Sequence, residues 1–194
     1  MLPGDDGRVT GYGPLPMTVL RKGLLSGRAV VLAGIPSPAL AAALGGLGAR
    51  ILDLDATLDE DAARAWADAA GPIDAVLYDA RPAFSGGGQA ALREATERAW
   101  VATRAVATGA LIPAGAGKVV LIAPRPDAGP FAPAVRAALE NLARTLSVEW
   151  ARYGVTAVAI APGPHTRDDE LAELVAYLVS PAGEYFDGCL FDLG

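Results

Sequence analysis

The chain has 194 residues, of which 52% are hydrophobic and 20% are charged, and its net charge at neutral pH is −6. This length and apolar content suit one globular domain and exclude a disordered chain. The acidic balance, without a local basic patch, argues against a nucleic-acid partner. Cys189 is the only cysteine and His165 the only histidine. A disulfide framework is therefore excluded, and a catalytic triad or histidine metal site could form only around His165.

The N-terminal segment and the distribution of apolar residues bear on localisation. Residues 1–26 are rich in glycine and proline and are interpreted as an extended arm. The first residues include acids and lack an apolar stretch, so we expect no signal peptide. No apolar run reaches the roughly 18 residues of a membrane span. We therefore expect a cytoplasmic protein that does not bind membranes, with a single domain over residues 27–194.

Beyond the arm, short apolar runs rich in β-branched residues alternate with helical patterns. The predicted strands are 29–33, 51–54, 75–78, 119–123, 155–161 and 189–191. The predicted helices are 38–47, 59–70, 89–111, 133–152 and 168–179. Strands that are apolar throughout are typical of a parallel sheet covered on both sides. The pattern predicts an α/β fold, a three-layer Rossmann-like doubly wound parallel sheet with helices on both faces.

The predicted helix 133–152 has one strongly apolar face. That face is formed at helical spacing by Val135, Leu139, Leu142, Leu146 and Trp150. The other sides of the helix carry several small alanine side chains, among them Ala138 and Ala143. Two interpretations of this alanine-rich surface stay open. It is either the ordinary surface of an alanine-rich chain or a contact with a helix of another subunit.

Several segments carry a family resemblance. The strand-like segments LLSGRAVVLAG and LGARILDLD come first, followed by GPIDAVLYDAR. The long stretch RAALENLARTLSVEWARYGVTAVAIAPGPHT and the final YLVSPAGEYFDGCLFDLG complete the set. In this order they resemble the short-chain dehydrogenase/reductase family over residues 24–194. In that family the third segment ends in Asn-Asn-Ala-Gly, and the long stretch holds an interface helix and a Pro-Gly turn. The resemblance implies a Rossmann-like fold and NAD(P)-dependent oxidoreductase chemistry.

The turn after the first predicted strand departs from the family pattern. The family holds the cofactor pyrophosphate on a glycine-rich turn at a helix N-terminus. Here Gly34 is followed by a shorter turn with two prolines, and Ser37 before Pro38 is typical of a helix N-cap. Asp55 matches the position that binds the ribose in NAD enzymes, and we interpret it as a solvated carboxylate. We expect no cofactor in this chain. An anion bound at this helix N-terminus stays open as the alternative.

The positions of the family's catalytic groups are also altered. The family uses a tyrosine to transfer a proton, with a lysine four residues later that lowers the tyrosine's pKa, and a serine and an asparagine that assist. The resemblance places Ala132 at the tyrosine, Arg136 at the lysine and Ala95 at the asparagine. The serine position falls at Ala123 or Pro124. Three of the four polar groups are missing, and the guanidinium of Arg136 does not replace an ammonium group. We therefore expect no catalytic residues and no metal ligands.

The segment after the Pro-Gly turn is short. The family carries a substrate lid there, whereas residues 162–166 run directly into the acidic start of the last predicted helix. An oxidoreductase with relocated catalytic groups remains an alternative. It would have to use Tyr78, Asp79, Arg81 or His165.

The segments that match the family's subunit interfaces are retained. Predicted helices 89–111 and 133–152 match a four-helix contact, and residues 188–194 match a second interface. The candidate interface residues are Trp100, Ala138, Ala143, Arg144 and Phe191. The sequence thus predicts a non-catalytic pseudoenzyme subunit of a hetero-oligomer, a dimer or a tetramer. Its partner would be a catalytically complete family member that carries NAD(P), with a hydroxyacyl-thioester dehydrogenase as the candidate by analogy. A homo-oligomeric scaffold or small-ligand-binding regulator is the other alternative.

Overall fold

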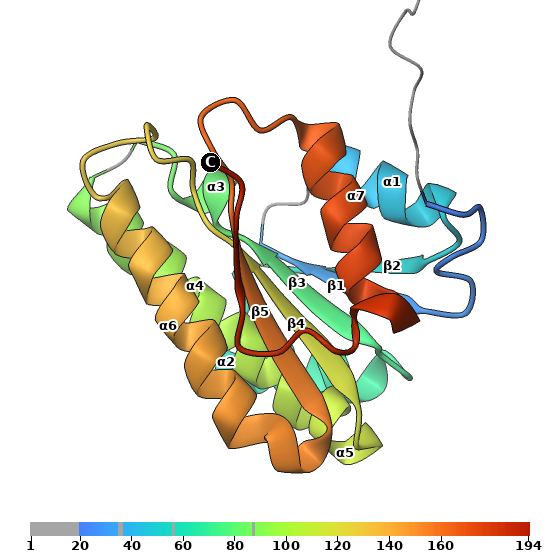
Figure 1. Ribbon diagram of the computed structural model, residues 1–194. Coiled ribbons are helices and arrows are strands. Elements are labelled where there is room, and N and C mark those ends of the chain that lie inside the picture. Colours follow the sequence, from blue (N-terminus) through green and yellow to red (C-terminus); the bar gives the residue numbers. More distant parts are fainter. Residues whose placement is uncertain (1–19, 35–36, 56, 87) are drawn as a thin grey trace, which may run out of the picture.

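The computed structural model describes residues 20–34, 37–55, 57–86 and 88–194. The described strands form a parallel sheet in the order β2-β1-β3-β4-β5-β6 (Figure 1). They are β1 (Ala29–Ala33), β2 (Arg50–Leu54), β3 (Ala75–Asp79), β4 (Gly117–Ile122), β5 (Val155–Ala161) and β6 (Leu190–Asp192). The predicted parallel sheet is confirmed, with strand ends that differ from the prediction by one or two residues.

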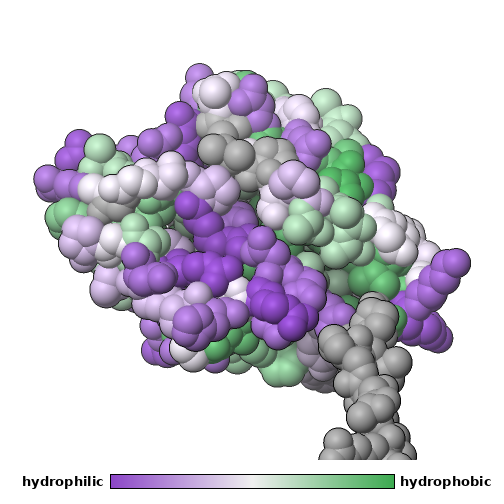
Figure 2. All heavy atoms as spheres, turned by 90° about the horizontal axis from the view of Figure 1, so that it is seen from above, coloured by the Kyte–Doolittle hydropathy of each residue, from purple (hydrophilic) through white to green (hydrophobic). Residues whose placement is uncertain are grey.

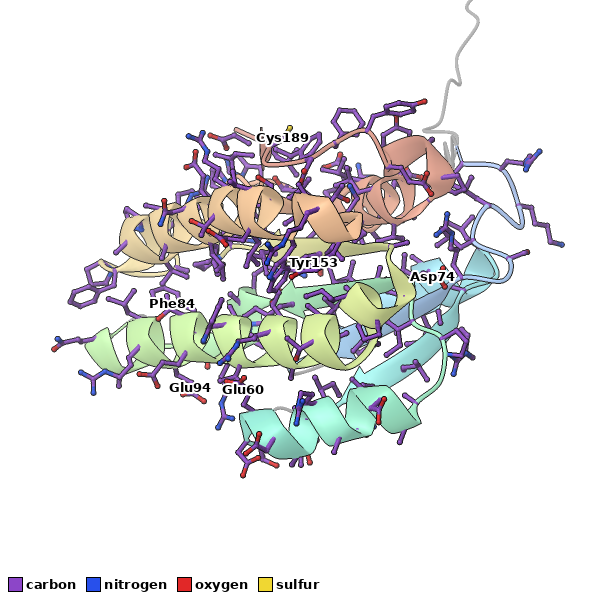
Figure 3. The ribbon with its side chains drawn as sticks, turned by 90° about the horizontal axis from the view of Figure 1, so that it is seen from below. Glu60, Asp74, Phe84, Glu94, Tyr153 and Cys189 are labelled. Atoms are coloured by element: carbon purple, nitrogen blue, oxygen red, sulfur yellow. The ribbon has the colours of Figure 1, made fainter. Side chains whose placement is uncertain are left out.

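Helices cover both faces of the sheet. They are α1 (Pro38–Gly46), α2 (Glu60–Ala69), α3 (Ala80–Ala83), α4 (Gln89–Val106), α5 (Ile112–Ala114), α6 (Ala132–Trp150) and α7 (Asp168–Val179). The apolar sides of α2, α4 and α6 pack on one face, and those of α1 and α7 pack on the other. Figure 3 shows α4 between α2 and α6. The three-layer doubly wound fold is therefore confirmed.

The central strands are buried from end to end, which explains their uniform apolarity. Every residue of β1 and β3 is buried. Along β1, Val30 and Leu32 face the α1/α7 layer, whereas Val31 and Ala33 face the α2/α4/α6 layer. Each fully buried valine or leucine side chain contributes about 1.5 to 3 kcal/mol. Both faces of the sheet thus supply the core.

The predicted single helix 89–111 is divided in the structure. It begins as α4, continues as a π-helical turn over Ala107–Leu111 and ends in α5. A proline at position 113 lacks the N–H that a continuous α-helix would need there. A Cβ atom on Gly109 would be 2.7 Å from the Arg64 carbonyl oxygen of α2, so this turn crosses α2 closely. The wider turn accommodates both constraints.

The end of the predicted arm is not extended. Residues 1–19 lie outside the described residues, and residues 22–27 form turns. The Leu25 N–H donates a hydrogen bond to the Leu47 carbonyl oxygen, and the Leu25 side chain is fully buried. Leu25 therefore belongs to the core of the domain that was predicted to begin at residue 27.

The direction of the strand order reverses between β1 and β3. The chain places β2 on one side of β1 and β3 on the other. In open α/β sheets, ligands bind outside the carboxyl ends of the strands at such a switch point. Here the two strands that flank it end at Ala33 and Asp79. In the part of the chain that is described, no helix is long and apolar enough to span a bilayer.

Candidate functional site

A cleft of about 580 Å³ lies at the switch point, beside the carboxyl ends of β3 and β4. The polar residues that line it are Ser37, Asp79, Arg81, Arg125, Asp127 and Asp168. Figure 2 views the molecule from above the carboxyl ends, and hydrophilic side chains gather near the middle of this face. The cleft is therefore strongly polar, with both signs of charge.

Arg81 is fixed at the centre of this cleft by an ion pair with Asp79. The buried Asp79 carboxylate accepts hydrogen bonds from Nε and Nη2 of Arg81 and from the Arg81 N–H. The remaining Nη1 donates to Oδ1 of Asp168 at 2.7 Å. Burial alone would lower the pKa of Arg81, but hydrogen bonds with Asp79 and Asp168 and their charges raise it. Arg81 therefore keeps its charge and cannot act as a base.

The Tyr78 ring fills the space next to the end of β1. Its hydroxyl is buried and has no hydrogen-bond partner among the described residues. Burial raises the pKa of Tyr78 above its ordinary value. The cavity between Tyr78, Gly34 and Asp55 has room for only about 10 Å³, the space of one water molecule. A tyrosine in this environment is unsuited to proton transfer at neutral pH.

Ser37 and Asp55 both have local structural partners. Ser37 is the N-cap of α1, and its side chain accepts a hydrogen bond from the Leu40 N–H at 3.5 Å. Asp55 accepts hydrogen bonds of 2.8 Å from both the N–H and the hydroxyl of Thr57. Both hydrogen bonds lower the pKa of Asp55, and the one from the Thr57 backbone N–H has the larger effect. Ile35 and Pro36 of the predicted turn lie outside the described residues.

Three of the four positions that the resemblance assigns to the family's catalytic set lie in or against the core. Ala95 and Ala132 are fully buried, and Ala123 and Pro124 are buried at the end of β4. None of these side chains carries a polar hydrogen. They therefore offer no group for proton transfer.

Arg136 donates hydrogen bonds to residues at the ends of three strands. Its Nη1 donates to the Pro124 carbonyl oxygen at 3.1 Å and to the Pro162 carbonyl oxygen at 2.7 Å. Its Nη2 donates to Oδ1 of Asp192 at 3.3 Å. These partners follow β4, follow β5 and end β6, respectively. The guanidinium group that occupies the family's lysine position thus has structural partners.

Arg125 holds the short loop between β5 and α7. Its Nη1 donates to the carbonyl oxygens of Gly163 and Pro164, and its Nη2 donates to that of Thr166. Arg125 is not predicted from the sequence, because its partners lie some 40 residues away along the chain. The only available signal was an arginine between two prolines directly after a strand. Asp168 was interpreted only as a helix start.

His165 is exposed on this loop, apart from the switch-point cleft. It lines a surface groove together with Glu170 and Leu174. That groove shares no lining residue with the cavity at Tyr78 or with the cleft at Arg81. The structure therefore brings Asp79 and Arg81 together but leaves His165 outside their site.

The candidate interface residues differ in exposure. The Trp100 side chain lies on α4 and is 41% exposed, and Ala138 on α6 is half-buried. Arg144 is exposed and pairs with Glu140 one helical turn away, at 2.6 Å. Phe191 is half-buried and packs edge-to-face on a neighbouring phenylalanine ring.

Ala143 requires a correction. It is 1% exposed and lies in the core cluster together with Leu139 and Leu146. Positions 139, 143 and 146 are four and three residues apart, so they share one helix face. Ala143 thus faces the sheet and is not part of the exposed surface of α6.

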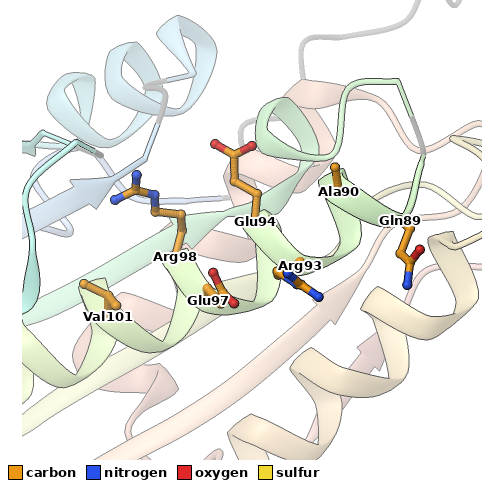
Figure 4. A pocket seen from close by; sticks show the side chains of 7 residues that line it. All are labelled: Gln89, Ala90, Arg93, Glu94, Glu97, Arg98 and Val101. Carbon is orange, nitrogen blue, oxygen red and sulfur yellow. The ribbon is translucent and has the colours of Figure 1, made fainter.

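A surface hollow of about 620 Å³ runs along α4 (Figure 4). The residues that line it all come from this helix: Gln89, Ala90, Arg93, Glu94, Glu97, Arg98 and Val101. Two arginines and two glutamates balance one another's charge. The hollow is an open helix surface and holds no cluster of catalytic groups.

The described residues do not contain a metal centre. Within the described ranges, no three side chains of the types His, Cys, Asp or Glu come together to hold an ion. Cys189 is half-buried near the C-terminal strand, and its Sγ contacts the Asp187 carbonyl oxygen at 3.2 Å (Figure 3).

Comparisons with known proteins give structural likeness but no sequence relative. No family model matches the chain, and no curated protein matches it. A citronellol catabolism dehydrogenase from Pseudomonas aeruginosa is similar with a TM-score of 0.71 and 20% identity, over 90% of this chain and 96% of that one. A gluconate 5-dehydrogenase from Burkholderia cenocepacia, in complex with NADP and tartrate, has a TM-score of 0.71 and 20% identity, over 89% and 95%. A hydroxysteroid dehydrogenase from Escherichia coli has a TM-score of 0.67 and 21% identity, over 89% and 98%.

These likenesses decide the fold. The chain has a Rossmann-like α/β fold, which these three dehydrogenases share. The three enzymes are named as dehydrogenases, which supports the resemblance to short-chain dehydrogenases and reductases. At about 20% identity, the likeness to this chain shows a shared architecture and no shared activity.

Proposed function

We propose that this chain is a non-catalytic subunit of a hetero-oligomer, joined to a catalytically complete short-chain dehydrogenase/reductase that carries NAD(P). The observation that carries the proposal is the state of the catalytic positions. Ala95, Pro124 and Ala132 are buried and apolar. Arg136 uses its guanidinium group to donate hydrogen bonds to residues at three strand ends. A site built this way holds the sheet together and has no group to move a proton.

The switch-point cleft supports the absence of a cofactor in this chain. Arg81 ends the segment that resembles the family's Asn-Asn-Ala-Gly strand end, and its side chain reaches Asp168 at the start of α7. The cavity beside Tyr78 has space for about one water molecule, far less than a nucleotide base needs. In this proposal the NAD(P) belongs to the partner. By analogy, its substrate is a hydroxyacyl thioester or a similar alcohol.

The outer surface of α4 and α6 supports the subunit role. Trp100 on α4 and Val148 on α6 are large apolar side chains with 41% and 77% exposure. On the side of α6 that carries Val148, the exposed residues toward the helix start are Ala134, Ala137 and Asn141, and Arg144 is the charged residue between Asn141 and Val148. With the hollow along α4, this face offers a surface for partner helices. A lasting interface of this kind buries about 1,600 Å² in total.

The alternatives differ in their support. A homo-oligomeric scaffold would use the same helices, and the stoichiometry distinguishes it from a hetero-oligomer. An enzyme with relocated groups is disfavoured because the Tyr78 hydroxyl is buried and Arg81 is held by Asp79.

Co-purification tests the proposal. The chain is expressed alone and together with a complete family member from an adjacent gene, and each preparation is analysed by size-exclusion chromatography with light scattering. We expect one joint complex from the co-expression. Ala138→Arg on α6 should dissociate it, whereas Ala42→Arg on the exposed side of α1, in the opposite layer, should leave it intact. A monodisperse monomer in both preparations contradicts the proposal, and a complex of this chain with itself alone favours the scaffold.

A further inference from the structure

One edge of the sheet ends at β2, and the outer backbone groups of this strand have no partner among the described residues. β2 pairs in parallel with β1, and the Arg50 N–H donates to the Arg28 carbonyl oxygen at 2.8 Å. Because backbone N–H and C=O groups alternate in direction along a strand, those of Ile51 and Asp53 point away from β1. An exposed row of such groups is a template for another strand, and native proteins cover or blunt it.

The side chains of β2 leave this edge largely apolar. Ile51 packs against the core cluster under α1 and α7, and Leu52 packs against the cluster on the opposite face. Both are only half-buried, whereas every residue of the neighbouring β1 is buried. Nη2 of Arg50 donates to the Pro72 carbonyl oxygen at 2.7 Å, so this guanidinium group is directed across the sheet and not along its edge. Asp53 is the other charged residue of β2. A further strand would bury the two aliphatic side chains.

The chain that precedes β1 joins the domain next to this edge. The Leu25 N–H donates at 3.0 Å to the carbonyl oxygen of Leu47, which lies in the connection between α1 and β2. A Cβ atom on Gly48, in the same connection, would be 2.7 Å from Oγ of Ser26. Leu20 packs against the α1/α7 core cluster. Figure 1 shows the described chain beginning beside α1, on the side of the sheet where β2 lies. Residue 19 is therefore attached to the domain close to the start of β2.

The sequence just before the described residues has the pattern of an edge strand. Residues 14–19 are Pro-Leu-Pro-Met-Thr-Val, with both prolines at even positions. Proline lacks the N–H that a ladder needs, and in sheets it is found on edge strands with that side facing solvent. With the even positions facing outward, the backbone groups of Leu15, Met17 and Val19 would face β2. In antiparallel pairing the side chains of these three residues share the face of Ile51.

We propose that residues 15–19 add to β2 as an antiparallel strand, so that the chain covers this edge of its own sheet. The direction follows from the connectivity, because the segment ends close to the start of β2. β2 has five residues, and a segment of equal length matches its span of about 17 Å. Main-chain hydrogen bonds give strand addition its affinity, and the covalent link raises the effective concentration of the added strand. The inference goes beyond the proposed subunit role and does not depend on it.

Amide hydrogen exchange of the full chain, followed at single residues by NMR, tests this pairing. The Ile51 and Asp53 amides should be protected from exchange. Met17→Pro removes an N–H that faces β2 and should speed the exchange of both amides about tenfold or more. Thr18→Pro is the matched control, because it removes an N–H on the outer side and should leave both rates unchanged. The Arg50 amide, which is bonded to β1, should stay protected in both variants and so shows that they fold.

Three results would overturn the proposal. The first is exchange of the Ile51 and Asp53 amides in the wild-type chain at the rate of exposed loop amides. The second is an equal acceleration by Met17→Pro and Thr18→Pro. The third is protection that falls when the protein is diluted, which would assign the edge to a second copy of the chain. The exchange experiment uses the chain alone, so its failure and a failed co-purification are separate results.

Discussion

The ring of Tyr78 lies directly against Gly34, so that a Cβ atom on Gly34 would be 3.4 Å from Cε2 of Tyr78. Gly34 has a φ of +100°, a conformation that side chains other than glycine rarely adopt. The contact joins the end of β1 to the end of β3 across the switch point. The aromatic ring fills the space beside Gly34 and leaves a cavity of only about 10 Å³, and its hydroxyl lacks a described partner.

Tyr78→Phe should stabilise the chain. The substitution removes a buried hydroxyl that forms no described hydrogen bond and keeps the ring that fills the space. We expect the free energy of unfolding to rise by about 1 kcal/mol, measured by urea denaturation. Tyr185→Phe, at an exposed position, serves as the control and should change nothing. A loss of stability in Tyr78→Phe would mean that the hydroxyl is hydrogen-bonded, for example to a buried water molecule.

Restoring the proton-transfer pair should not restore activity. Ala132 is fully buried, so Ala132→Tyr overpacks the core at the start of α6 and costs about 1 to 3 kcal/mol. Arg136→Lys loses part of the contact to three strand ends. We expect the double variant to be less stable than the wild-type chain and to show no NAD-dependent oxidation of simple alcohols. Measurable turnover would indicate a working cofactor site.

Stability should depend on pH through Lys118. Burial lowers the pKa of Lys118 from 10.5 to about 8, and its Nζ donates to the Phe186 carbonyl oxygen at 2.6 Å. Between about pH 8 and 10.5 the unfolded chain therefore binds more protons than the folded one, and the free energy of unfolding rises with pH. Below pH 8 both states are protonated and this contribution stays constant.

Lys118→Met isolates this effect from the other groups that titrate at high pH. The difference in unfolding free energy between the wild-type chain and Lys118→Met should shift in favour of the wild type by about 2 to 3 kcal/mol across that window. Urea denaturation in steps of pH measures it. A difference that is flat, or that shifts the other way, contradicts the assigned burial of the amine.

The two alanines of α6 should respond differently to arginine. Ala143 faces the sheet, so Ala143→Arg places a charge in the core and should prevent folding or destabilise the chain by about 3 kcal/mol or more. Ala138 is half-buried, and Ala138→Arg should leave the melting temperature of the isolated chain nearly unchanged. Thermal denaturation followed by circular dichroism compares them. Equal losses would contradict the orientation of α6.

Local sequence patterns were sufficient to predict the fold. Uniformly apolar runs such as 29–33 and 155–161 predicted buried parallel strands, and the Ser37-Pro38 pair predicted the start of α1. The turn at Ala107–Leu111 was not predicted because it depends on the close approach of Gly109 to α2. Such a contact between segments distant in sequence leaves no periodic signal.

The candidate site was less accessible to sequence reasoning. Asp79 and Arg81 are two residues apart and were named, but their partner Asp168 was interpreted only as a helix start. Arg125 reaches carbonyl groups of a distant loop, and a carbonyl oxygen is present at every residue. Ala143 was assigned to the surface because alanine occurs both in cores and on exposed helix faces. Its burial is decided by the packing of α6 against the sheet.

Cofactor titration of the isolated wild-type chain tests the central claim most directly. The claim is that this chain does not hold NAD(P) productively, because Arg81 is paired across the switch-point cleft and Tyr78 leaves room for about one water molecule in the separate cavity beside Asp55. Titration calorimetry with NADH and NADPH should show no saturable binding with a Kd below about 100 μM, which corresponds to about 5.5 kcal/mol. Saturable binding tighter than this limit would contradict the account.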